Sequence, residues 1–197
     1  MWYWVFRSFF VLFYKTFFKF KVEGLDNLPH KTNFIIIANH GSWMDPVVLG
    51  VAVPRRINYI AMRALYSISW LRWYVKLMSA LPTGTSSEKA IELLNKYKNV
   101  GLFPEGACTG DGSLRTFRRG AALLAIKTGR PVVPCAILGT YESYPRGRLF
   151  PKLFVPIKVI IGKPIYLLKE FHETIDDVCL QEGIFRVRNA VKQMLNV

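Results

Sequence analysis

Residues 33–46 read NFIIIANHGSWMDP, and this stretch decides the fold. Its first six residues form a short, continuous apolar run, which is typical of a strand buried on both faces of a parallel sheet. The run ends in the polar loop 39–42, and a helical pattern follows over 43–51. A strand that passes through a polar loop into a helix is the repeating unit of an α/β domain.

The remaining chain repeats this alternation of short apolar runs and helical patterns. Strands are predicted at 57–61, 100–103, 132–138 and 157–161, and helices near 65–78 and at 86–97, 119–128 and 175–195. Ser86, with an acidic residue in the following turn, favours a helix start. The pattern predicts one α/β domain over residues 22–197, with a mainly parallel sheet flanked by helices.

The first residues differ from the rest of the chain. Eleven of the first 20 are aromatic and none is acidic. On a helix, Ser8, Lys15 and Lys19 lie close to one line and leave a broad face of Trp, Phe and Leu. This predicts an amphipathic anchor helix over 1–21 that lies in the membrane interface, with its lysines reaching the headgroups.

Three alternatives for this segment were weighed. Charges interrupt every run long enough to span a bilayer, so a helix lying on the membrane is favoured over a spanning one. The pattern of a cleavable signal peptide is absent, and we therefore expect association with the cytoplasmic face of a membrane. A helix that simply packs on the domain is the third possibility.

The charge of the chain indicates an anionic partner. It carries 27 Lys and Arg against 13 acidic residues, a net charge of +14, and 51% of its residues are hydrophobic. Nucleic acid, an anionic membrane and phosphorylated small molecules all fit such a charge. The hydrophobic content favours the membrane, and the basic residues are scattered, which disfavours a nucleic-acid reader. The spacing of the three cysteines suggests neither a disulfide framework nor a metal site, so we expect a reducing compartment.

The loop after the first apolar run carries the candidate catalytic pair. Loops that leave strand ends build the sites of α/β sheets. His40 lies there, and a neutral imidazole can take a proton from a hydroxyl. It does so best when a carboxylate holds its other nitrogen, and Asp45, five residues on, is spaced to reach it. A turn with a helix-capping histidine is the structural alternative.

Two later loops supply candidate substrate-binding residues. Glu105, at a strand end, could bind an acceptor hydroxyl, and the Gly106 backbone could approach a substrate closely. Arg115, Arg118 and Arg119 precede an apolar helix whose N-terminus would help them to hold a phosphate. A turn with an exposed acid and a solvated arginine face are the structural alternatives.

These motifs occur in the order seen in the PlsC-type glycerolipid acyltransferases, which the chain resembles over about residues 22–165. Asn39-His40 through Asp45 resembles the family's N-H-x-x-x-x-D block, and residues 103–106 match its F-P-E-G block. Further agreement is found at Asp111-Gly112, Phe117 and Gly120, in the V-P-C-A-I segment 133–137, and in the lead-in V-E-G-L-D-N-L-P at 22–29.

The resemblance implies a glycerol-3-phosphate acyltransferase-like fold with a mixed sheet, and an O-acyltransferase that needs no metal or cofactor. His40, steadied by Asp45, would deprotonate the free hydroxyl of a lysophospholipid, with 1-acyl-glycerol 3-phosphate as the expected acceptor. The alkoxide would attack the thioester of acyl-CoA or acyl-carrier protein. Substrate-binding roles are implied for Asn39, Ser42, Arg63, Phe103, Pro104, Glu105, Gly106, Arg115, Arg118 and Arg119.

The chain departs from the family at two places. F-P-E-G is usually followed by Thr-Arg-Ser, whose arginine is taken to hold the acceptor's phosphate, whereas this chain has Ala107-Cys108-Thr109. A second block, near Ala-Lys-x-Glu-Leu, reads A-M-R-A-L at 61–65. Either Arg63 or a loop arginine substitutes, or the acceptor is not phosphatidic. Cys108 as an acylated nucleophile is a less favoured hypothesis, supported only by the nearby arginines.

Two other classes of function stay open. A serine or cysteine hydrolase uses similar parts, although the chain lacks a G-x-S-x-G elbow. A non-catalytic protein that binds membranes or anionic ligands would also carry a high positive charge. Acyl-chain length, the choice of donor and the oligomeric state leave no signature in the sequence.

Overall fold

A computed structural model describes residues 2–61, 81–82, 86–167 and 176–196. These residues form a seven-stranded sheet in the order β1-β7-β6-β2-β5-β3-β4. The strands are β1 (Lys21–Glu23), β2 (Ile35–Ala38), β3 (Ile57–Ala61), β4 (Leu81–Pro82), β5 (Asn99–Leu102), β6 (Val132–Leu138) and β7 (Lys158–Ile161). Neighbouring strands are parallel except for the antiparallel pair β6 and β7.

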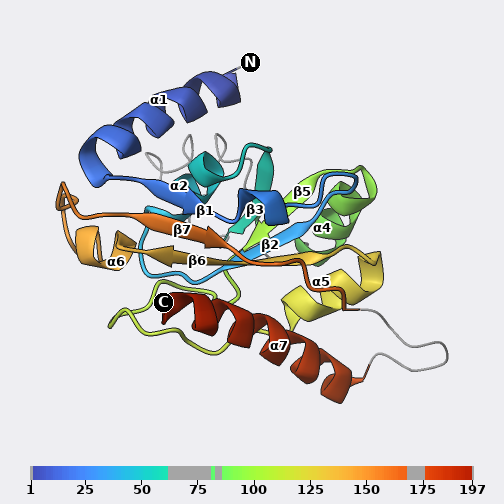
Figure 1. Cartoon of the computed structure of the whole chain (residues 1–197). Helices are drawn as coiled ribbons and strands as arrows, with labels where there is room; N and C mark the ends of the chain where they lie inside the picture. Colours follow the sequence, from blue (N-terminus) through green and yellow to red (C-terminus); the bar gives the residue numbers. More distant parts are fainter. Residues whose placement is uncertain (1, 62–80, 83–85, 168–175, 197) are drawn as a thin grey trace.

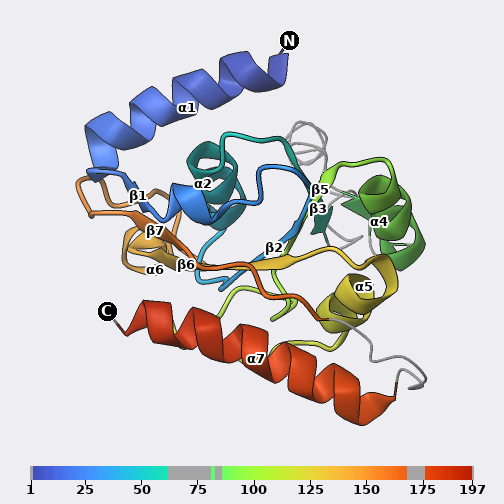
Figure 2. The same cartoon turned by 45° about the vertical axis from the view of Figure 1, so that its right-hand side comes forward.

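Helices cover both faces of this sheet. They are α1 (Trp2–Phe18), α2 (Asp45–Ala52), α4 (Ser86–Asn95), α5 (Gly120–Thr128), α6 (Thr140–Ser143) and α7 (Asp177–Leu195), with a 3₁₀ turn at Leu25–Asn27. Helices α1 and α2 lie on one face, and α5 and α7 on the other (Figures 1 and 2). Strand β2 is fully buried between them: Ile36 packs toward α2, and Ile35 and Ile37 pack toward α5 and α7.

The predicted α/β fold with a mixed, mainly parallel sheet is confirmed. Strands 57–61 and 132–138 have the predicted bounds, and the other three begin or end within two residues of them. The prediction that a helix begins at residue 43 was wrong, because Ser42 to Asp45 form a turn first, closed by the Asp45 N–H on the Ser42 carbonyl. The helix predicted near 65–78 lies outside the described residues.

Helix α1 packs on the domain with one face and exposes the other. Tyr14 and Phe18 are buried in the core that it shares with α2, and Arg7 Nη2 donates to the Val51 carbonyl at 2.8 Å. The outward row is apolar and exposed, and comprises Trp4, Val5, Phe9 and Leu12. Part of the apolar surface predicted for a membrane therefore contacts the protein itself. Among the described helices, none is both long and apolar enough to cross a membrane.

The strand order places three loops at one edge of the sheet. Strands β5 and β6 flank β2 and run parallel to it, so their carboxyl ends meet there. After this edge, β2 continues into α2 on one face and β5 continues toward α5 on the other (Figure 1). Adjacent strands whose connections diverge in this way open a crevice, where α/β proteins bind their ligands.

Candidate active site

His40 and Asp45 come together at the carboxyl end of β2. His40 Nδ1 lies 2.9 Å from Asp45 Oδ2, and the Ser42 N–H donates to the same oxygen at 2.8 Å. The Asp45 side chain is fully buried, whereas that of His40 is 16% exposed. When Nδ1–H donates to the carboxylate, the neutral imidazole keeps Nε2 as its proton acceptor. The predicted spacing of five residues thus produces an oriented His–Asp pair.

Opposing effects act on the pKa of His40. Burial disfavours the charged ring and lowers the pKa, but hydrogen bonds with Asp45 and Cys108, together with the negative charge of Asp45, raise it. The net result is a pKa raised from 6.5 to about 10. The site therefore stabilises the protonated imidazole of His40 relative to a free histidine.

Glu105 links the loop after β2, which carries His40, to the loop after β5. Its Oε1 accepts the backbone N–H of His40 at 2.8 Å, and its Oε2 accepts that of Arg115 at 3.2 Å. The carboxyl group is buried, which raises its pKa in spite of these two bonds. Both oxygens accept hydrogen bonds from the protein backbone, so Glu105 has a structural role that the sequence did not predict.

A second backbone bond holds the same two loops together. The Thr109 N–H donates to the His40 carbonyl at 2.9 Å. This bond places Cys108 beside the imidazole, with Sγ 3.3 Å from Nε2 and 3.7 Å from Nδ1. Phe103 stacks against the same ring, with centroids 4.4 Å apart and planes inclined by 26°. His40 is therefore fixed by a carboxylate, an aromatic ring and a thiol.

The three predicted arginines occupy different environments. Arg119 Nη1 pairs with Asp177 Oδ1 at 2.6 Å, so α7 holds it. The guanidinium of Arg118 packs on Gly106, where a Cβ atom would lie only 2.7 Å from Arg118 Cζ. Gly106 also has a φ of +82°, which favours glycine. Arg118 thus lies at the F-P-E-G turn, while the side chain of Arg115 points to solvent from a loop that α7 clamps through its backbone.

The other predicted residues support the site's architecture. The Asn39 amide exchanges two hydrogen bonds with the backbone of Ile137 in β6, at 2.8 and 2.9 Å. Ser42 Oγ donates to the Tyr144 carbonyl at 2.6 Å and is buried. Pro104 is also buried, and Arg63 lies outside the described residues.

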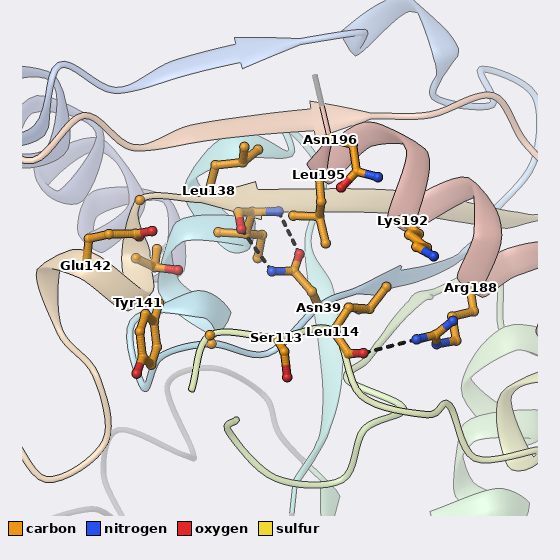
Figure 3. A pocket seen from close by; sticks show the side chains of 15 residues that line it. Asn39, Ser113, Leu114, Leu138, Tyr141, Glu142, Arg188, Lys192, Leu195 and Asn196 are labelled. Carbon is orange, nitrogen blue, oxygen red and sulfur yellow. Dashed lines mark hydrogen bonds between the residues drawn. The ribbon is translucent and has the colours of Figure 1, made fainter. Parts of the chain in front are cut away.

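A cavity of about 410 Å³ lies directly beside the loop that carries His40. Asn39 and Gly41 line it, although His40 between them does not. Figure 3 shows Arg188 and Lys192 of α7 on one side of this cavity and Tyr141 and Glu142 on the other. The remaining lining residues are Gly112, Ser113, Leu114, Ile137, Leu138, Gly139, Thr140, Leu195 and Asn196.

Tyr141 and Asp111 were not among the predicted site residues. Tyr141 covers Gly41 and Gly112, and its hydroxyl donates to the Gly110 carbonyl at 2.9 Å. Asp111 accepts hydrogen bonds from Thr109 and Ser113, which lower its pKa. Tyr141 could have been found, because it follows a strand predicted to end at the same edge as His40.

The fold and the site together define a class. A histidine held by a buried carboxylate, at the crevice of a mainly parallel sheet, is an arrangement that can take a proton from a hydroxyl or thiol. The chain belongs to the Acyltransferase family, whose sequence pattern matches residues 19–138.

Comparison with individual proteins shows which members of this family the chain resembles. A chloroplastic 1-acyl-sn-glycerol-3-phosphate acyltransferase of Brassica napus is 32% identical over 76% of the chain, and the chain spans 46% of its length. The 1-acyl-sn-glycerol-3-phosphate acyltransferase of Bacillus subtilis is 33% identical over 74% of the chain and is 73% covered. The crystal structure of PlsC, the 1-acyl-sn-glycerophosphate acyltransferase of Thermotoga maritima, superimposes with a TM-score of 0.70 and 29% identity, covering 89% of this chain and 72% of that one.

Proposed function

We propose that this protein transfers a fatty acyl group from an acyl thioester to the free hydroxyl of a lysophospholipid, with 1-acyl-glycerol 3-phosphate as the acceptor. The observation that carries the proposal is the pair His40–Asp45, joined at 2.9 Å within residues 19–138, which match the family pattern, in a chain whose relatives are named for this reaction. The donor is acyl-CoA or acyl-carrier protein, and no cofactor takes part.

In this reaction His40 Nε2 takes the proton of the acceptor hydroxyl. The resulting alkoxide attacks a thioester carbonyl, the C–O bond forms, and the C–S bond breaks as the thiol leaves with the proton from His40. Asp45 stabilises the imidazolium between these two steps. General-base catalysis of this kind contributes a factor of about 10²–10⁴. The remainder has to come from positioning and from donors to the developing oxyanion.

We assign the acceptor's phosphate to Arg118. The chain has no arginine at position 108, where the family motif has one, and the guanidinium of Arg118 packs on Gly106, two residues before it. A guanidinium can hold a phosphate through two parallel hydrogen bonds. A lysolipid with another headgroup remains the alternative acceptor. Arg188 and Lys192 line the neighbouring cavity and offer a second pair of cations, which would bind such a headgroup or the anionic donor.

We further propose that the protein acts at the cytoplasmic face of a membrane, through the outer face of α1. The exposed row Trp4, Val5, Phe9 and Leu12 is continued by Phe154, whose ring lies 6.2 Å from that of Phe17. Leu149 and Phe150, 80% and 74% exposed, belong to the same loop. Apolar side chains of this size, next to basic residues, are typical of interfacial binding.

Acyl transfer by the detergent-solubilised protein tests the proposal. Labelled acyl-CoA and acyl-carrier protein are supplied with lysophosphatidic acid and with several other lysolipids. Transfer to one acceptor should be lost in His40→Ala and kept in His30→Ala, an exposed histidine before β2. Transfer that survives in His40→Ala contradicts the general-base role. A folded protein that transfers to none of the acceptors would instead support a non-catalytic binding protein.

A further inference from the structure

The loop between α6 and β7, residues 144–157, carries apolar side chains into solvent. Four large ones are exposed: Leu149, Phe150, Leu153 and Phe154. The loop lies at the C-terminal end of α1 in both views (Figures 1 and 2). There the Phe154 N–H donates to the Phe17 carbonyl at 2.7 Å. Exposed apolar clusters of this kind mark surfaces that contact a protein or a membrane.

The backbone of Phe154 has a conformation that bulky residues rarely adopt. Its φ is +63°, in the left-handed region. Two hydrogen bonds to the end of α1 hold the segment there: the one from Phe154 to Phe17, and one from the Ile157 N–H to the Phe18 carbonyl at 2.9 Å. Packing on the domain does not account for the conformation, because Phe154 is 64% exposed. A strained residue of this kind points to a functional contact.

The loop is ordered by its own hydrogen bonds. Ser143 and Lys152 exchange two of them across its base: the Lys152 N–H donates to the Ser143 carbonyl at 2.8 Å, and Ser143 Oγ donates to the Lys152 carbonyl at 2.9 Å. The Tyr144 carbonyl accepts Ser42 Oγ, from the loop that carries His40, at 2.6 Å. An ordered loop loses little conformational entropy when it binds, and this one is joined to the candidate active site.

The charges of the loop match an anionic surface. Arg146, Arg148 and Lys152 are exposed, and the loop contains no acidic residue. Lys15 and Lys19, at the neighbouring end of α1, are exposed as well. Basic residues that flank a cluster of apolar side chains are typical of proteins that insert into the surface of anionic membranes. A nucleic acid would match the charge but leave the apolar side chains in water.

We propose that this loop inserts its apolar side chains into an anionic membrane surface, as a second point of attachment beside α1. The inference rests on the proposed membrane-bound function and deepens it, since it assigns a lipid class and a second contact. A single helix lying on a membrane leaves the protein free to roll about the helix axis. A contact outside the helix restricts this rotation and holds the sheet edge that carries His40 in a defined position relative to the lipid.

Sedimentation of the full chain with vesicles tests the insertion. The vesicles contain phosphatidylcholine alone or together with phosphatidylglycerol, which is anionic. Leu149→Ser combined with Phe150→Ser should weaken binding to both about tenfold or more, because less apolar surface is removed from water. Tyr97→Ser, which changes a similarly exposed ring just after α4, is the matched control and should bind as the wild type does.

Variants of the two arginines test the lipid class. Arg146→Gln combined with Arg148→Gln should bind phosphatidylcholine vesicles as the wild type does. The preference for vesicles with phosphatidylglycerol should fall about tenfold, because two cations near the surface are lost. An unchanged preference would overturn the assignment of anionic lipid to this loop.

Phe154→Gly separates a membrane contact from a structural role. Glycine adopts a φ of +63° without strain, so the urea midpoint of unfolding should stay the same or rise. Vesicle binding should fall nevertheless. A variant that loses stability and keeps wild-type binding would show that Phe154 serves the fold alone, which contradicts the inference.

Phe9→Asp, on the outer face of α1, separates this inference from the proposed function. Weakened binding by Phe9→Asp and by the loop variants supports attachment at two points. If Phe9→Asp weakens binding while the loop variants bind as the wild type does, the inference is overturned and attachment through α1 stands. Wild-type binding by all of them overturns both. Since the vesicles contain neither acyl donor nor acceptor, none of these results bears on the proposed acyl transfer.

Discussion

At the scale of single residues, proton affinity decides what the site can do. The carboxylate of Asp45 stabilises the imidazolium of His40 and also prevents the ring from turning, and burial makes both effects stronger. The local spacing of the two residues was readable in the sequence. The raised pKa was not, because it depends in part on the hydrogen bond with Cys108, which is 68 residues away in the chain.

The raised pKa of His40 predicts a pH profile. The value of kcat/KM for the lysolipid should rise with pH, with a midpoint above the ordinary imidazole value of 6.5, because only the neutral ring accepts the hydroxyl proton. Asp45→Asn removes a negative charge, so its midpoint should shift to lower pH while the rate falls at every pH. Rates measured across the pH range check this. An unshifted midpoint in Asp45→Asn contradicts it.

The different environments of two neighbouring arginines predict different kinetics. Arg118→Ala should raise KM for a phosphate-bearing acceptor roughly 10- to 100-fold, since a hydrogen bond to a charged group contributes about 1.5–3 kcal/mol. Arg119→Ala should change KM little, because its guanidinium pairs with Asp177 on α7. Initial rates at varied acceptor concentration compare the two variants. Equal effects would remove Arg118 from the phosphate site.

At the scale of elements, loops from different strands complete the site. The loop after β2 carries His40, but Glu105 and Thr109, after β5, fix its backbone. The sequence predicts that Glu105 binds substrate, and the structure adds that it links the two loops. The distinction depends on β5 being the immediate neighbour of β2, a pairing that local periodicity does not encode.

This connection predicts a stability effect. Glu105→Gln replaces one of two accepting oxygens by an amide that faces a backbone N–H, and the buried group loses its charge. We expect the free energy of unfolding to fall by about 1–3 kcal/mol. Urea unfolding measures it, with Glu182→Gln on the exposed side of α7 as the control. Equal stability of both variants would contradict the role of Glu105.

The outer row of α1 predicts membrane binding through specific side chains. Phe9→Asp should weaken binding to lipid vesicles about tenfold or more, because burying an aromatic side chain in the interface contributes about 1.5–3 kcal/mol. Tyr97→Asp, which changes a similarly exposed ring just after α4, should bind as the wild type does. Vesicle sedimentation measures both. Unimpaired binding by Phe9→Asp would exclude this face.

At the scale of the whole molecule, the charge of +14 acts together with the apolar surface. Vesicles containing anionic lipids should bind the protein more tightly than neutral ones, and salt should reduce this difference, since exposed charges more than about 8 Å apart are screened at physiological ionic strength. Sedimentation with each lipid mixture at low and high salt tests it. Binding that depends on neither the lipid charge nor the salt concentration would show that the net charge does not contribute to membrane binding.

The sequence by itself determined the class of fold and the pairing of His40 with Asp45. Buried strands are recognisable in the sequence as continuous apolar runs such as 34–38. His40 and Asp45 lie close enough in the chain for a single turn to join them. Very short elements escaped prediction: β1, β4 and α6 have between two and four residues, too few for a period to show.

Only the tertiary structure decided which residues meet around that pair. The order β6-β2-β5 brings Cys108, from the loop after β5, to His40 and Tyr141, from the segment after β6, to Gly41, and the docking of α7 pairs Arg119 with Asp177. The physical reason is that strand order and helix docking follow from the packing of the two cores on either side of the sheet. That packing sums many weak contacts between distant residues, and no local pattern of sequence records it.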